Sequence, residues 1–105
     1  MMRHVSMFRL KPEYRIPEVI GQIESQLRLL PEKLPSITDC EIGVKPVEMP
    51  AESPDGHVRF YDLIQIITFA SPKDCADYPA SAAHQEFLAF SGKYMEQVVG
   101  IDYEV

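Results

Sequence analysis

The segment YDLIQIITF, residues 61–69, is apolar at six of its nine positions and has apolar residues at both odd and even positions. Side chains of a β-strand alternate between its two faces, so this strand would place apolar residues on both sides of its sheet. An antiparallel sheet that meets water on one side carries polar residues there instead. The segment therefore predicts a sheet whose two faces are both covered.

Three further segments predict strands. They either alternate between apolar and polar positions or are rich in β-branched residues. Together with the first segment, the predicted strands cover residues 3–10, 39–47, 61–69 and 98–105.

Two regions predict helices. The first has apolar residues at i, i+3 and i+4 spacing, and Pro31 and Pro35 mark where regular helix should fail. The second has Ser71 as its N-cap, stops near Pro79 and restarts with Ser81 as a new N-cap. The predicted helical ranges are 16–34, 71–78 and 81–97.

The order of these elements is β-α-β-β-α-β, which is the ferredoxin-like arrangement of an α+β domain with an antiparallel four-stranded sheet. Its helices can cover only one face of the sheet. The other face would expose a large apolar patch, so we expect a homodimer that buries it sheet to sheet. The expected interface residues are Val5, Met7, Ile64, Ile66, Val99, Ile101 and Tyr103.

Charge and cysteine usage exclude several partners. The formal net charge is −6, so neither nucleic acid nor an anionic membrane surface is an expected partner. The first residues lack an apolar run of signal-peptide length, which favours the cytoplasm, where Cys40 and Cys75 would be reduced core residues. The histidines lack metal-ligand spacing, so we expect no metal and no cofactor. His57 falls in a predicted surface loop at 48–60.

Five segments together resemble the stress-responsive A/B barrel (Dabb) domain: MMRHVSMFRLK, LPSI, YDLIQIITFASPKD, DYPASAAHQEF and VVGIDYEV. They span nearly the whole chain in the order of that family. The resemblance implies a single Dabb domain over residues 1–105, whose sheet pairs with that of a partner to form a dimeric α/β barrel. It also implies a small dimeric stress-response or ligand-binding protein without assigned chemistry.

A plant branch of this family acts as a polyketide cyclase through a tyrosine and a histidine in a Y-x-x-H-P-x-H stretch. In the matching stretch YPASAAH, Tyr78 and His84 correspond to that tyrosine and the second histidine. His4 also resembles the cyclase branch. The chain departs from that branch at four positions, which are Leu27, Leu63, Ser81 and Ala82.

A candidate catalytic group follows from the placement of His84. With Ser81 as N-cap, His84 lies in the first helical turn, where the partial positive charge disfavours imidazolium and leaves a usable base. Asp102 would orient His84, and Tyr78 would hydrogen-bond a substrate carbonyl, which suits cyclisation or isomerisation. The expected substrate-binding residues are His4, Ser6, Gln65, Leu63 and Phe87.

A structural interpretation of the same residues stays open. In it, Asp102 and His84 satisfy each other and fix the second helical region on the sheet, while His4 is a satisfied core histidine. Two classes of function follow from these alternatives. One is a binding or stress-response protein that carries a small apolar ligand, and the other is a cofactor-independent cyclase, isomerase or oxygenase-like enzyme.

Overall fold

The computed structural model describes residues 1–46, 48–49 and 61–105, and the histidine of the predicted loop, His57, lies outside them. Short 3-10 turns at Pro12–Tyr14, Tyr78–Ala80 and Gly92–Tyr94 connect the longer elements. In chain order these are β1 (Met2–Leu10), α1 (Pro17–Lys33), β2 (Ile37–Val44), β3 (Leu63–Phe69), α2 (Pro72–Asp77), α3 (Ala82–Ser91) and β4 (Met95–Glu104).

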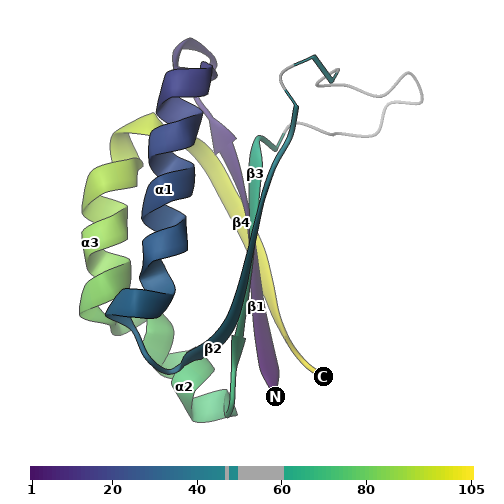
Figure 1. Ribbon diagram of the computed structural model, residues 1–105, viewed down its shortest axis with the longest axis vertical. Helices are drawn as coiled ribbons and strands as arrows, with labels where there is room; N and C mark the ends of the chain where they lie inside the picture. The colour runs from purple at the N-terminus through teal and green to yellow at the C-terminus, as the bar shows by residue number, and fades with distance from the viewer. Residues whose placement is uncertain (47, 50–60) are drawn as a thin grey trace.

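Within the described residues, four strands form one antiparallel sheet in the order β2-β3-β1-β4. The central strand β1 therefore pairs with both β3 and β4. Helices α1 and α3 lie side by side on one face of the sheet and leave the other face bare (Figure 1). This is the predicted ferredoxin-like α+β arrangement.

The hydrophobic core lies between the sheet and the two long helices. The buried stripe of α1 has the predicted helical spacing and consists of Val19, Ile20, Ile23, Leu27 and Leu30. Opposite it, β1 and β3 contribute Phe8, Leu10, Ile67 and Phe69, each at most 4% exposed. This core covers β2, β3 and β1, whereas β4 is exposed along most of its length.

The expectation that helix fails at Pro31 was wrong, because α1 continues through this residue to Lys33. A proline in the last turn removes one intrahelical hydrogen bond. The burial of Leu27 and Leu30 outweighs that loss, and the Leu34 N–H still donates to the Leu30 carbonyl at 2.9 Å.

The expectation of a helix up to residue 97 was also wrong. Helix α3 ends at Ser91, and β4 already begins at Met95, which pairs with Leu10 of β1. The Lys11 N–H donates to the Tyr94 carbonyl at 2.9 Å just before this pairing begins. Strand pairing therefore overrides the helical spacing of the apolar residues at this point.

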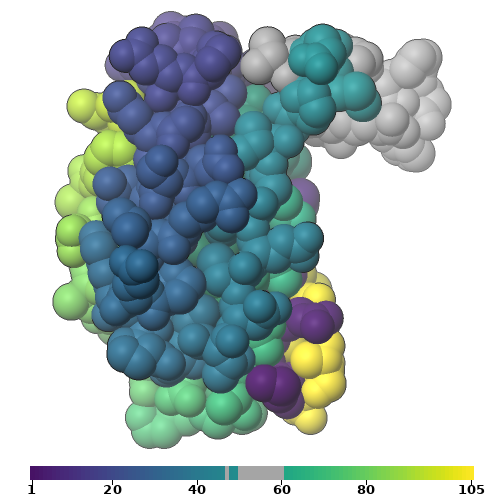
Figure 2. Space-filling model, viewed as in Figure 1, coloured from purple at the N-terminus to yellow at the C-terminus, as the bar shows by residue number. Residues whose placement is uncertain are grey.

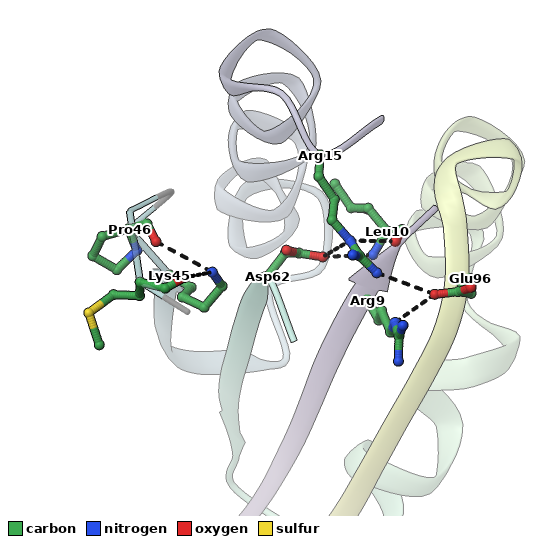
Figure 3. Close-up of polar contacts among 8 residues, drawn as sticks. Arg9, Leu10, Arg15, Lys45, Pro46, Asp62 and Glu96 are labelled. Atoms are coloured by element: carbon green, nitrogen blue, oxygen red, sulfur yellow. Dashed lines mark hydrogen bonds and ion pairs between the residues drawn. The ribbon is translucent and has the colours of Figure 1, made fainter. Parts of the chain in front are cut away.

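A buried carboxylate fixes one end of β1 (Figure 3). Asp62 accepts a hydrogen bond from the Leu10 N–H at 2.8 Å, and its own N–H donates to the Phe8 carbonyl at 2.7 Å. Arg15 donates to the Leu10 carbonyl at 3.0 Å and lies 3.6 Å from the Asp62 carboxylate. The same guanidinium reaches Glu96 of β4 at 3.3 Å, so the contacts join β1 to both of its neighbours.

The opposite end of β1 is held by the chain termini, which lie next to one another (Figures 1 and 2). The Val105 N–H donates to the Met1 carbonyl at 2.9 Å, and the Met1 ammonium donates to the Val105 carbonyl at 3.3 Å. The β1–β4 ladder is therefore closed at both ends.

The bare face carries the apolar residues that the alternation predicts. Val5 pairs with Ile66 and Ile101, and Met7 pairs with Ile64 and Val99, so all of these side chains share the face opposite the helices. Ile101 is 62% exposed. None of the helices in the described residues has the length and apolar character needed to span a membrane.

Candidate active site

A cavity of about 520 Å³ lies between α3 and the β1–β4 half of the sheet. Its volume is within the usual range of small-molecule sites. The apolar part of its lining includes Phe8, Phe87, Leu88, Met95 and Val98. Its polar side chains are His4, Ser6, Gln65, Tyr78, His84, Ser91 and Asp102.

Three of the polar side chains form a hydrogen-bonded chain across β1 and β4. His4 and Asp102 are opposite each other in the ladder, and their Nδ1 and Oδ1 atoms are 2.5 Å apart. The Nε2 atom of His4 lies 2.8 Å from the Ser6 hydroxyl, two residues along the same face of β1. A carboxylate only accepts, so His4 Nδ1–H donates to Asp102. In a neutral ring Nε2 then carries the lone pair and accepts the Ser6 O–H.

Gly100 faces Ser6 in the ladder, at a point where the backbones of β1 and β4 approach closely. A Cβ atom at this position would lie 2.6 Å from the Val5 carbonyl oxygen and 3.5 Å from the Ser6 hydroxyl. Any larger residue would therefore push β4 away from β1 and fill space above Ser6. The glycine serves both the close approach of the strands and the shape of the cavity.

Tyr78 stands between the two histidines at the base of α3. Its ring packs edge-on against His84, with centroids 4.7 Å apart, and against His4 at 5.3 Å. Burial raises the pKa of the Tyr78 phenol to about 12, and the neighbouring Gln65 amide offsets part of this rise. The phenol therefore stays protonated near neutral pH and is available as a hydrogen-bond donor.

Gln65 lies opposite Ser6 on β3 and is 2% exposed. Its amide interacts with the Tyr78 phenol, and its buried Nε2 atom has no other hydrogen-bond partner among the described residues. An amide nitrogen carries two N–H donors, so beside the Tyr78 phenol it has a second donor that an acceptor of a bound molecule would satisfy.

His84 is fixed by the turn that precedes α3. Its backbone N–H donates to the N-cap hydroxyl of Ser81 at 3.2 Å, as predicted. Its ring Nδ1 lies 3.0 Å from the Pro79 carbonyl, which also accepts from Gln85 Nε2 at 2.8 Å. Since a carbonyl only accepts, Nδ1 carries the proton and Nε2 carries the lone pair.

The expected pairing of Asp102 with His84 was wrong. Asp102 binds His4, its partner in the strand register, whereas His84 lies on α3 and is oriented by the Pro79 carbonyl. Burial lowers the pKa of His84 below its ordinary value of 6.5, and the hydrogen bond to Pro79 opposes this only in part. The imidazole is therefore neutral near pH 7.

The Stress responsive A/B Barrel Domain model matches residues 2–105 of the sequence. The chain belongs to this family.

Solved structures give the same picture of the fold. The crystal structure of an Arabidopsis thaliana protein matches this chain with a TM-score of 0.80 and 24% sequence identity. The match covers 100% of this chain and 95% of that chain. A dimeric protein of unknown function from Bacteroides fragilis is 20% identical in sequence, with a TM-score of 0.79. The match covers 99% of this chain and 95% of that chain. The hydroxynitrile lyase of Passiflora edulis is 21% identical in sequence, with a TM-score of 0.78. The match covers 99% of this chain and 92% of that chain. No curated protein matches the sequence.

Most of the residues expected at a site in this Dabb domain do line the cavity. The exception is Leu63, which is 2% exposed and lies in a separate hollow beside Val44, Lys45 and Asp62. Sequence reasoning missed the Pro79 carbonyl and Gly100, and the glycine in an otherwise apolar strand was the available signal for the latter. In the described ranges, no three His, Cys, Asp or Glu residues are grouped as metal ligands.

The lowered pKa of His84 predicts a pH dependence. The ring should titrate below 6.5, so the unfolded chain binds this proton first as the pH falls. The free energy of unfolding should therefore decline from pH 6.5 down to the folded-state pKa of His84. Histidine ring resonances followed by NMR across this range measure the pKa directly. A His84 titration at or above 6.5 would contradict the burial argument.

Proposed function

We propose that this Dabb domain binds a small, uncharged carbonyl compound in the cavity and catalyses proton transfer next to its carbonyl group. His84 acts as the base, and Tyr78 donates a hydrogen bond to the carbonyl oxygen. The observation that supports this most strongly is the fixed tautomer of His84, whose Nδ1 is held by Pro79 while its Nε2 is left with the lone pair. A small cofactor-independent enzyme follows from this arrangement.

The proposed reaction needs a base that can accept a proton and a donor that still carries one, and the two side chains meet these needs. His84 is neutral because burial lowers its pKa, and Tyr78 is protonated because burial raises its pKa to about 12. A neutral imidazole removes the C–H proton, and the phenol stabilises the negative charge that develops on the carbonyl oxygen. The two rings are in contact, so one bound carbonyl compound would meet both.

The substrate class follows from the cavity lining. No lysine or arginine of the described residues lines it, and its walls include Phe8, Phe87 and Leu88. An anionic substrate would therefore have no counter-charge. An apolar compound with one or two carbonyl or hydroxyl groups fits both the walls and the polar side chains.

The similar structures support catalysis in this fold without fixing the reaction. One is a hydroxynitrile lyase, and another is a putative antibiotic biosynthesis monooxygenase from Nitrosomonas europaea, at 14% identity and a TM-score of 0.65. One fold can host unrelated chemistries, so the reaction here is argued from the side chains of this chain.

The dimer is proposed to form through the bare face of the sheet. Similar structures from Bacteroides fragilis, Thermobifida fusca and a Jannaschia species are described as dimeric ferredoxin-like proteins. Burying the same face in a two-fold dimer removes its apolar patch from water and gives a dimeric α/β barrel. The proposed interface residues are Val5, Met7, Ile64, Ile66, Val99, Ile101 and Tyr103.

The compartment proposed for this dimer is the cytoplasm. Cys40 and Cys75 are both free thiols, which suits a reducing compartment.

The Ile101→Lys variant tests the interface. A charge on the bare face should convert the dimer to a monomer, because an unpaired ammonium is costly to bury. The matched control is Val98→Lys, on the same strand but on the helix side of the sheet, which should stay dimeric. Sedimentation velocity at micromolar concentration measures both variants. A wild-type monomer, or equal dissociation of the two variants, would contradict the proposed interface.

The proton-transfer proposal predicts that the protein accelerates exchange of the protons next to the carbonyl of 1-phenylpropan-2-one in D₂O, measured by NMR. In the His84→Ala variant the exchange rate should fall by about 10²–10⁴-fold, which is the usual contribution of a positioned base. Tyr78→Phe should also slow exchange, because the enolate loses its donor. The matched control is Glu86→Gln, an exposed position on the same helix.

Two results of this experiment would count against the proposal. One is exchange by the wild type no faster than in buffer, and the other is exchange unaffected in a folded His84→Ala variant. Saturable binding of the ketone without exchange would favour the ligand-binding alternative.

A further inference from the structure

We propose that Ser6 is a nucleophile, activated by His4 and Asp102, and that the cavity supports acyl transfer from small uncharged esters. This activity is separate from proton transfer by His84, because its nucleophile and base lie on β1 and its carboxylate on β4. It rests on three observations: the hydrogen-bonded order of the three side chains, the position of Ser6 in the cavity lining, and the buried amide of Gln65 opposite Ser6.

The order of the hydrogen bonds is that of an activated serine. Asp102 accepts from His4 Nδ1, and His4 Nε2 accepts from the Ser6 hydroxyl at 2.8 Å. A nucleophile in contact with a base, and a base oriented by a carboxylate, is the arrangement that activates a serine whatever the fold around it. The roles depend on this geometry and not on the sequence positions.

Ser6 lies deep in the cavity but is reachable from it. The residue is 6% exposed and belongs to the lining, and Gly100 contributes no side chain above the hydroxyl. The His4 side chain is 20% exposed and that of Asp102 is 54% exposed, so the polar chain runs from the mouth of the cavity to its floor. An ester could therefore enter from the β4 side and place its carbonyl carbon over Ser6.

Gln65 is placed to stabilise the oxyanion that such an attack creates. It is directly opposite Ser6 in the β1–β3 ladder, where paired side chains on one face lie about 5 Å apart at Cβ. Its Nε2 is buried, and the Tyr78 phenol is the one group in the described part of the chain with which its amide interacts. An oxyanion next to Ser6 would supply an acceptor for the second N–H of this amide, and such donors contribute strongly to acyl transfer.

The proposed step is balanced without a cofactor. The Ser6 oxygen forms a bond to the ester carbonyl carbon while its proton passes to His4 Nε2. The carbon–oxygen bond to the leaving group then breaks, and His4 returns the proton to the departing alcohol or phenol. Water attacks the acyl-serine next, giving its proton to His4, and the carboxylic acid leaves as Ser6 regains its proton.

The test is covalent labelling with diisopropyl fluorophosphate, which phosphorylates an activated serine with loss of fluoride. We expect one adduct per chain by intact mass, located on Ser6 by peptide mapping, together with turnover of 4-nitrophenyl acetate. The Ser6→Ala variant should lose both signals. The Ser25→Ala variant, at an exposed serine on α1, should keep them.

Asp102→Asn separates activation of the serine from a structural role. Labelling should slow by about 10²–10⁴-fold with the unfolding midpoint nearly unchanged, and Asp102→Glu should restore part of the rate. Equal labelling rates in the wild type and a folded Asp102→Asn variant would overturn the role of the carboxylate in activation.

Peptide mapping of the wild type locates the adduct whether or not Ser6→Ala folds. No adduct, or an adduct on another residue, overturns it. Labelling and proton exchange test the two proposals separately. Absence of labelling with intact ketone exchange overturns only the serine nucleophile. Ser6 labelling without ketone exchange overturns only the function proposed for His84.

Discussion

The pairing of β1 with β4 determines where the polar side chains of the cavity lie. It puts His4 opposite Asp102 and Ser6 opposite Gly100. A slip of one residue would turn Asp102 to the bare face and leave His4 without its acceptor. The ladder is protected against such a slip at both ends, by the Asp62 cluster at the end of β1 and by the hydrogen bonds between the chain termini.

The two faces of this sheet serve different purposes. On the helix side, α1 packs closely over β2 and β3, whereas the ten-residue α3 leaves a cavity between itself and β4. Polar side chains in that cavity come from β1, β3, α3, β4 and the 3-10 turn at Tyr78. The backbone positions most of them through the strand register and the N-cap of α3. The bare side has apolar residues and no covering helix, which suits a second copy of the chain (Figure 1).

The sequence predicted the strands, the two apolar faces and the serine N-caps, because alternation and capping are local signals. It also placed His4, Ser6, Gln65 and Asp102 on one face, since the ferredoxin-like order makes β1 and β4 neighbours. It paired Asp102 with the wrong histidine, because the partner depends on the register and on the direction of the Pro79 carbonyl. Neither is a local property. The expected break at Pro31 was wrong for a similar reason, since burial of Leu27 and Leu30 is decided by tertiary packing.

The most direct test of this account is the tautomer of His4, measured by nitrogen-15 NMR of the imidazole ring in mildly alkaline buffer. The account predicts a proton on Nδ1, shielded from exchange by Asp102, and a lone pair on Nε2. Asp102→Asn should remove this preference. A proton on Nε2, or a ring that averages between the two tautomers in the wild type, would contradict the hydrogen-bonded chain from Asp102 to Ser6.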